Sequence, residues 1–496
     1  MIQRWFQHVF FRAAACLVVI GGLAACSANR GIPGSPSDLV IEPVSFTPPS
    51  PVEWKLANGL TVYFLPDDEL PLMKGVLVYP GGSLYEPRDR TGLAALCGSQ
   101  MREGSIQGIR PEQLDRTLDS LGASVESAFN EEYGSISFSG LTEDAETILT
   151  IVSDVARRPA FDANRLSLAK QLSFEAIRRR KDDPATMAGI TFARYVYGAD
   201  SPYAWAPTPE TIQRITRDDL IAFRRRFVRP EGAILAITGA LSEAEARALV
   251  DKIFASWAGD PEQWVRPTPP PVGDTLKPGL YILPREFDQA TVKIGHRGPA
   301  RTTPDFYRLS VFNSVFGYGG FTSVLFREVR TKLGLAYSVW GGFDPGPVEG
   351  IFSIDAGTRA AEAGRTVERS IELAREARTE LYSEDLVQLA KDSARRSFVF
   401  RFETPRQVIG RRAWLVMHGF PEDFDDTYLP RISQVDPMDV RSVAASHIHP
   451  ENLVIVVVGS VPVADLVKRF GSERPIYLLH FDIEPHVIET LSAGPS

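Results

Sequence analysis

The chain has 496 residues, of which 44% are hydrophobic and 23% are charged. At about 100–250 residues per domain, this length indicates two to four domains of ordinary globular composition. These values exclude a largely disordered chain, a fibrous repeat and a protein with several membrane spans. The 54 Lys and Arg against 62 Asp and Glu give a formal net charge of −8. We therefore expect no nucleic-acid partner, because a phosphate backbone attracts basic surfaces.

Residues 1–25 have the pattern of a signal peptide. A basic segment without acidic residues precedes an apolar run that is too short to span a bilayer. The run ends in Leu-Ala-Ala-Cys, which resembles a bacterial lipobox and predicts lipidation of Cys26, with the lipid as the chain's only membrane attachment. The alternative is a plain secretory signal in which Cys26 is incidental. Because Ser27 follows the cysteine, the resemblance implies an outer-membrane lipoprotein that faces the periplasm.

Proline-rich segments divide the remainder of the chain. Residues 26–51 predict an extended tether, and residues 266–275 predict a stiff linker between two long segments, 52–265 and 276–490. The two long segments are of similar length, so the linker is expected to join two domains.

The two long segments also resemble each other. Residues 229–239 and residues 449–459 both read as a turn, an apolar β-branched run and a final glycine, at an offset of 449 − 229 = 220 residues. An amphipathic stretch follows each glycine. This offset is far too long for a solenoid repeat, so it predicts a duplicated α+β domain.

Within the first copy, hydrophobic periodicity and turn residues predict a strand meander with helices against one face. Each copy is thus expected to be a sheet rich in antiparallel pairs. The expected strands are 60–65, 74–79, 123–129 and 133–141, and the expected helices are 92–103, 110–121, 143–157 and 162–180.

Three stretches of the first copy, residues 58–62, 81–86 and 92–94, resemble the start of the M16 family of zinc peptidases, the group of insulinase, pitrilysin and mitochondrial processing peptidase. In active members, Gly-Leu-Ala leads into the motif H-x-x-E-H, whose histidines bind zinc and whose glutamate is the general base. The resemblance implies that the two homologous domains form one half of a clamshell.

The positions of that motif hold no zinc ligand in this chain. Ala95 and Ser99 occupy the histidine positions, and Gly98 occupies the glutamate position. The resemblance places the family's third ligand at Glu175, 76 residues after Ser99. One carboxylate does not hold catalytic zinc, which needs about three protein ligands. We therefore interpret Glu175 as a carboxylate on a helix surface and expect the chain itself to bind no cofactor.

The second copy retains a different motif. Residues 317–338 resemble the M16 C-terminal-domain signature, whose Arg and Tyr correspond to Arg330 and Tyr337. In the family this pair reaches an active site on another domain and binds the substrate backbone and the oxyanion. A guanidinium and a phenol O–H are suitable donors to a carbonyl oxygen that gains charge. The structural alternative is that Arg330 caps a helix end or forms a salt bridge there, near Glu328, and that Tyr337 packs on a strand.

The lost ligands of the first copy and the retained pair of the second predict a zinc-free accessory subunit of a heterodimeric metallopeptidase. The expected partner is an M16 subunit that contains H-x-x-E-H and holds zinc, and the expected substrate is a peptide. One alternative is a lipid-anchored peptide-binding or scaffold module without a peptidase role. Another is a peptidase that uses unusual ligands.

Overall fold

The computed structural model describes residues 46–259 and 263–491. The predicted signal peptide, Cys26 and most of the predicted tether lie outside these residues. From Thr47 onward the chain forms one compact unit, which contains two β-sheets. Over the described ranges, no helix is long and apolar enough to cross a membrane.

The first sheet has six strands in the order β1-β2-β6-β3-β5-β4. Neighbours are antiparallel except for β2 and β6, which run parallel with Thr61 opposite Ile234. Strand β4 lies at one edge. The strands are β1 Val52–Lys55, β2 Thr61–Pro66, β3 Leu72–Pro80, β4 Ser124–Phe129, β5 Tyr133–Leu141 and β6 Ile234–Gly239.

Most helices of the first copy pack on one face of this sheet, where apolar side chains of the helices and strands form one buried cluster. The expected strands and helices of this copy agree with the observed bounds to within two residues. The helices are α2 Leu93–Glu103, α3 Pro111–Leu121, α4 Ala145–Arg157, α5 Ala163–Arg179, α6 Pro184–Tyr197, α7 Pro209–Arg214, α8 Arg217–Phe227 and α9 Glu243–Phe254.

The second sheet has seven strands in the order β13-β12-β7-β11-β8-β10-β9, so β9 occupies an edge as β4 does in the first sheet. Its central pairs repeat the first pattern, because β11 is parallel to β7 and antiparallel to β8. The strands are β7 Gly279–Pro284, β8 Gln289–Gly298, β9 Ala336–Asp344, β10 Gly350–Arg359, β11 Val454–Gly459, β12 Ile476–Phe481 and β13 Pro485–Leu491.

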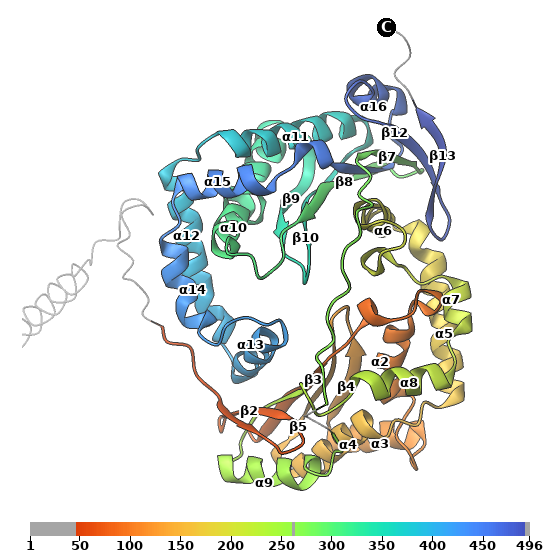
Figure 1. The fold of residues 1–496 in the computed structure, drawn as a ribbon, viewed down its shortest axis with the longest axis vertical. Helices are drawn as coiled ribbons and strands as arrows, with labels where there is room; N and C mark the ends of the chain where they lie inside the picture. Colours follow the sequence, from red (N-terminus) through yellow and green to blue (C-terminus); the bar gives the residue numbers. More distant parts are fainter. Residues whose placement is uncertain (1–45, 260–262, 492–496) are drawn as a thin grey trace, which may run out of the picture. The chain divides into compact units, whose positions relative to one another are not determined.

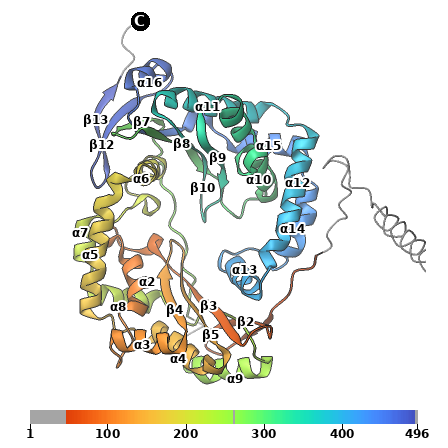
Figure 2. The same ribbon diagram turned by 180° about the vertical axis from the view of Figure 1, so that it is seen from behind.

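Helices α11 and α15 lie side by side over the second sheet (Figures 1 and 2). Two segments, Ser314–Tyr318 and Phe326–Lys332, are π-helical. The α-helices of this copy are α10 Phe306–Asn313, α11 Ala363–Thr379, α12 Glu384–Phe398, α13 Pro405–Met417, α14 Phe424–Ser433, α15 Pro437–His447 and α16 Val463–Phe470.

The helices and strands of the two copies correspond to each other. Strands β6 and β11 start and end 220 residues apart, as do helices α8 and α15. Both helices also begin with a capping box, formed by Thr216 with Asp219 and by Asp436 with Asp439. The predicted α+β class with two homologous sheet-and-helix halves is therefore confirmed.

One pair of equivalent helices is exchanged between the halves. Helix α6 of the first copy packs on β8 and β11, and Tyr195 stacks on Tyr281 of β7 with ring centroids 3.8 Å apart. Helix α13 of the second copy packs on β2, β3 and β6 of the first sheet, where Ala413 is buried. Figure 1 shows both helices beside the sheet of the other copy. Strands β6 and β11 are thereby covered on both faces, which explains why every residue in them is buried.

The proline-rich segment contains no helix or strand from residue 264 to residue 278. It is held by hydrogen bonds from tyrosines, since the Tyr203 hydroxyl donates to the Pro270 carbonyl at 2.9 Å and the Tyr85 hydroxyl donates to the Pro267 carbonyl at 3.4 Å. The linker therefore runs along the fold in contact with its surface.

Candidate functional site

Helix α2 carries the positions that resemble the zinc motif, and a buried carboxylate fixes its start. Glu86 is 6% exposed and accepts hydrogen bonds from the Gly92 and Ala94 N–H groups at 2.8 and 2.9 Å. Burial raises the pKa of Glu86 to about 7, although these two bonds act in the opposite direction. Glu86 thus satisfies the free N–H groups that begin a helix.

Ala95 and Ser99 line a groove of about 410 Å³ between α2 and α5. Apolar side chains form most of its wall, including Leu168 and the 62% exposed Leu172. The Ser99 hydroxyl lies 3.4 Å from the Leu96 carbonyl of its own helix. The surface that carries zinc ligands in the active relatives is therefore an apolar groove in this chain.

Glu175 lies on α5 but does not line this groove. Its carboxylate forms an ion pair with Arg178, one turn further along the helix, at 2.5 Å. The Glu175 side chain is exposed, as expected for a carboxylate on a helix surface.

Gly98, at the position of the family's general base, lies against the edge strand β4. A Cβ atom added to Gly98 would lie 2.5 Å from the backbone nitrogen of Phe129 and 2.8 Å from the carbonyl carbon of Ala128. The Ser127 hydroxyl closes the same contact by donating to the Gly98 carbonyl at 2.6 Å. No side chain fits between α2 and β4 at this position without moving the backbone.

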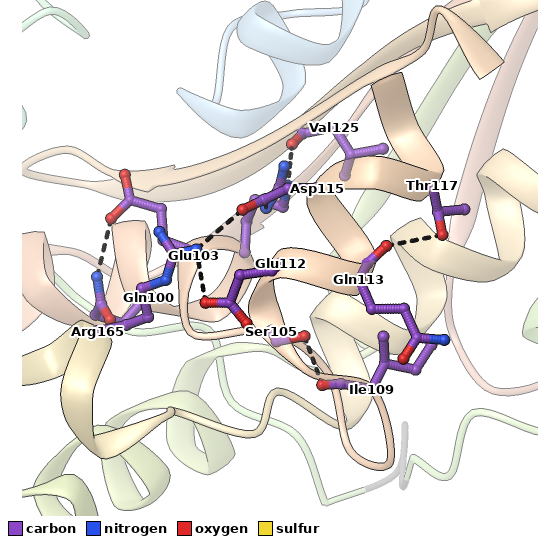
Figure 3. Close-up of polar contacts among 11 residues, drawn as sticks. Gln100, Glu103, Ser105, Ile109, Glu112, Gln113, Asp115, Thr117, Val125 and Arg165 are labelled. Carbon is purple, nitrogen blue, oxygen red and sulfur yellow. Dashed lines mark hydrogen bonds and ion pairs between the residues drawn. The ribbon is translucent and has the colours of Figure 1, made fainter. Parts of the chain in front are cut away.

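A polar network holds the other end of α2 (Figure 3). Asp115 of α3 accepts from Arg102 of α2 at 2.8 Å and from Arg165 of α5 at 3.0 Å, and Gln100 donates to Glu103 at 2.9 Å. Glu103 and Arg165 also line the groove. Charged groups thus hold this end of α2, and no sequence motif indicated these contacts.

The residues at this site do not fit a zinc ion. Ala95 and Gly98 offer no donor atom, Ser99 is a poor zinc ligand, and the one carboxylate of the set is paired with Arg178. Across residues 46–259 and 263–491, no three His, Cys, Asp or Glu side chains form a group that could hold a metal ion.

The retained motif of the second copy lies on two adjoining elements. Arg330 belongs to the π-helical segment Phe326–Lys332, and Tyr337 belongs to the edge strand β9. Gly334, with φ of 61°, closes the turn between them, and the Leu335 N–H donates to the Val329 carbonyl at 3.0 Å. Single π-helical turns occur often at functional sites, and no sequence pattern indicated this one.

The Arg330 guanidinium is exposed and lies over the Phe326 ring, 4.6 Å from its centroid. Over the described residues, Glu328 forms ion pairs with Lys332 at 2.8 Å and with Arg327 at 3.4 Å but not with Arg330. In the part of the chain that the structure describes, no carboxylate forms an ion pair with Arg330. Its donors are therefore available to a group from outside the chain.

Tyr337 is 52% exposed, so it does not serve mainly as strand packing. It lies at a β-bulge, where Ser338 pairs with Gly357 and Ala336 pairs with Thr358. The Tyr337 ring and hydroxyl occupy the space that a Cβ atom on Gly357 would need. Glycine at this position allows the phenol to lie across β10.

A second aromatic side chain on β9, Trp340, was missed by sequence reasoning. Trp340 is 48% exposed and stands opposite Asp355 of β10, which forms an ion pair with Lys293 of β8 at 2.7 Å. No motif indicated Trp340, and strand alternation alone would place positions 337 and 340 on opposite faces. The bulge at Tyr337 brings both side chains to the same face of β9.

Two models of known protein families match this chain. The family model of the peptidase M16 inactive domain matches residues 214–394, and the model of insulinase, peptidase family M16, matches residues 74–185. The two ranges together cover more than half of the chain. The chain belongs to the M16 peptidase family.

Relatives with similar sequences include uncharacterized zinc proteases of two bacteria. The Mycobacterium leprae protein is 29% identical over 245 residues, and the match covers 49% of this chain but only 55% of that protein. The Rickettsia bellii protein is 25% identical over 315 residues, which cover 61% of this chain and 72% of that protein.

Two solved structures share the fold. A peptidase M16 inactive domain from Pseudomonas fluorescens has a TM-score of 0.75 at 23% identity, with 83% of this chain and 98% of that chain covered. The periplasmic protease PqqL from Escherichia coli has a TM-score of 0.71 at 17% identity, with 85% of this chain and 46% of that chain covered. At these identities the likeness establishes the fold alone.

Proposed function

We propose that this chain is the zinc-free accessory subunit of a heterodimeric M16 peptidase of the cell envelope. Its partner is an M16 subunit with an intact H-x-x-E-H motif, and the substrate is a peptide. The observation that carries the proposal is the contrast between the two copies. Helix α2 has no ligand at positions 95, 98 and 99 and no space at Gly98. In contrast, Arg330 is exposed and forms no ion pair with a described residue, and Tyr337 is half exposed.

The proposed chemistry needs only donors from this chain. When a peptide carbonyl is attacked, its oxygen gains negative charge, and pre-positioned N–H and O–H groups stabilise that charge without reorganisation. No carboxylate among residues 46–259 and 263–491 forms an ion pair with the Arg330 guanidinium, and the turn at Gly334 holds its segment against β9. Arg330 and Tyr337 would thus bind the substrate backbone and the developing oxyanion at the partner's active site.

The membrane attachment forms part of the same proposal. A lipid at Cys26, outside the described residues, would hold the subunit at the outer membrane, and residues 26–51 would serve as its tether. Replacing Cys26 with Ser should release the mature chain from the membrane fraction while its fold stays intact.

The experiment is a purification of the tagged lipoprotein from its own detergent-solubilised membranes, followed by peptidase assays. The proposal expects a near-stoichiometric partner with H-x-x-E-H. Each subunit alone should be almost inactive toward a peptide library, and the pair should cleave it. Recovery of the chain without such a partner would contradict the proposal and favour the peptide-binding or scaffold module. Peptidase activity of the chain alone, abolished by a chelator, would favour the unusual-ligand enzyme.

A further inference from the structure

A second cavity lies in the other half of the chain, away from the residues assigned so far. It encloses about 280 Å³ between the segment that follows β8 and the segment that joins α13 to α14. The lining contains four aromatic rings, two arginines and one histidine, but no carboxylate. The lining residues are Arg301, Thr302, Thr303, Pro304, Phe306, Tyr307, His418, Gly419, Phe420, Pro421, Phe424 and Arg431.

The aromatic rings form a rigid apolar wall. Phe306 meets Phe420 and Phe424 edge to face, with ring centroids 5.6 Å apart in both pairs, and Phe420 and Phe424 meet each other at 4.7 Å. An apolar cavity of about 150 Å³ can hold benzene. The larger volume here therefore has space for an aromatic side chain together with a small polar group.

The charge of the lining is positive, and one of its cations has no counterion within the described part of the chain. Arg301 is ion-paired with Glu132 of the β4–β5 turn, so its charge is largely balanced. The Arg431 guanidinium lies over the Tyr307 ring, 5.1 Å from its centroid, and forms no ion pair with any described residue. A guanidinium in this setting binds a carboxylate well, because its N–H groups match the two oxygens.

The cavity opens to solvent on one side. Thr302, Pro304, Gly419 and Pro421 line it and are exposed. A ligand whose aromatic end lies inside could therefore continue outward as a longer chain.

We propose that this cavity binds the C-terminal aromatic residue of a peptide. The ring lies among Phe306, Phe420 and Phe424, the terminal carboxylate is held by Arg431, and the preceding residues leave past the exposed rim. The inference goes beyond the accessory role, because it concerns residues other than Arg330 and Tyr337 and needs no partner subunit.

The test uses calorimetric titration of the full chain, without a partner, with three probes. They are a peptide Ala-Gly-Ala-Gly-Phe with a free carboxylate, the same peptide as its C-terminal amide, and N-acetylphenylalanine. We expect the free acid to bind at least about tenfold more tightly than the amide, since a charge-assisted pair is lost with the amide. The peptide should also bind more tightly than N-acetylphenylalanine.

Substitution of the cation completes the test. Arg431→Gln should reduce the affinity for the free acid to that for the amide, and Arg431→Lys should restore part of it. Arg441→Gln is the matched control, because Arg441 lies on the next helix and does not line the cavity. Equal binding of acid and amide, or an unchanged affinity in Arg431→Gln, would overturn the proposal. Equal binding of N-acetylphenylalanine and the peptide would overturn its peptide part and assign the cavity to free aromatic acids.

Discussion

At Gly98, helix α2 packs so closely against strand β4 that the position cannot carry a side chain. The family's general base would stand at this position, but the backbone of Phe129 and Ala128 occupies the space that its Cβ atom needs. The Ser127 hydroxyl ties the Gly98 carbonyl to the same strand. Backbone packing therefore leaves no space for a side chain at this position, and the zinc ligands are absent as well. Restoring the histidines alone would not restore a peptidase.

Replacing Gly98 with Ala should destabilise the fold by at least about 2 kcal/mol, because backbone atoms cannot yield as a flexible side chain does. Urea unfolding at constant pH measures the change. Gly189→Ala is the matched control, since Gly189 is also helical and its added Cβ would meet nothing within 4 Å. That control should be neutral or more stable by up to about 1 kcal/mol. Equal stabilities of the two variants would contradict the close contact of α2 and β4.

Gly357 sets the position of Tyr337 in a comparable way. An added methyl group would meet the Tyr337 ring and hydroxyl, so Gly357→Ala should turn the phenol away from its place. We expect the kcat/KM of the complex with its partner to fall about as far as it does in Tyr337→Phe. Gly410→Ala, which has open space around it, should leave the activity unchanged. Full activity of Gly357→Ala would show that the placement of Tyr337 has no role in turnover.

At the scale of the elements, the start of α2 depends on the buried carboxyl of Glu86. Its pKa in the folded chain is about 7, whereas the ordinary value is 4.5. Between these values the folded chain keeps a proton that the unfolded chain releases. The free energy of unfolding should therefore fall as the pH rises from about 4.5 through 7.

The Glu86→Gln variant should lack this dependence, because an amide does not titrate in this range. The stability difference between the native chain and the variant should change by up to about 3 kcal/mol between pH 4.5 and 8, at about 1.4 kcal/mol per pKa unit. Denaturant midpoints at several pH values measure it. Glu143→Gln is the control, because it removes an exposed carboxylate. Its free energy of unfolding should change with pH as that of the native chain does. A pH-independent difference for Glu86→Gln would contradict the raised pKa.

The elements themselves were largely predictable from sequence, for physical reasons. Residues 133–141 alternate between two faces, and residues 143–157 have helical periodicity, so local patterns located β5 and α4 closely. The π-helical segment Phe326–Lys332 was not predictable, because its geometry depends on the packing of Val329 and the turn at Gly334. In the candidate site, motif positions indicated the lost ligands, but the contact of Gly98 with β4 exists only in three dimensions.

At the scale of the whole molecule, the predicted linker and domain ranges describe only part of how the two halves are joined. The linker divides the chain at residues 266–275, yet the halves also interlock through α6 and α13. Sequence periodicity identifies such helices but does not indicate which sheet they cover. Two hydrophobic clusters thus combine a helix of one copy with the sheet of the other, which couples the stability of the two halves.

We therefore expect the native chain to unfold in one calorimetric transition. Ala413→Glu should place an unpaired carboxylate between α13 and the first sheet, which costs about 3 kcal/mol or more, and should separate the transition into two. Arg406→Glu on the same helix is exposed and should leave a single transition. Two transitions in the native chain would contradict the coupling.

The central claim is that this chain completes a partner's site through Arg330. The most direct measurement is kcat/KM of the reconstituted complex with Arg330→Ala, beside Arg327→Ala as an exposed control three residues away. Loss of an oxyanion donor predicts a decrease of about 100-fold or more for Arg330→Ala, with complex formation and the control unaffected. Unchanged turnover of the Arg330→Ala complex would contradict the claim.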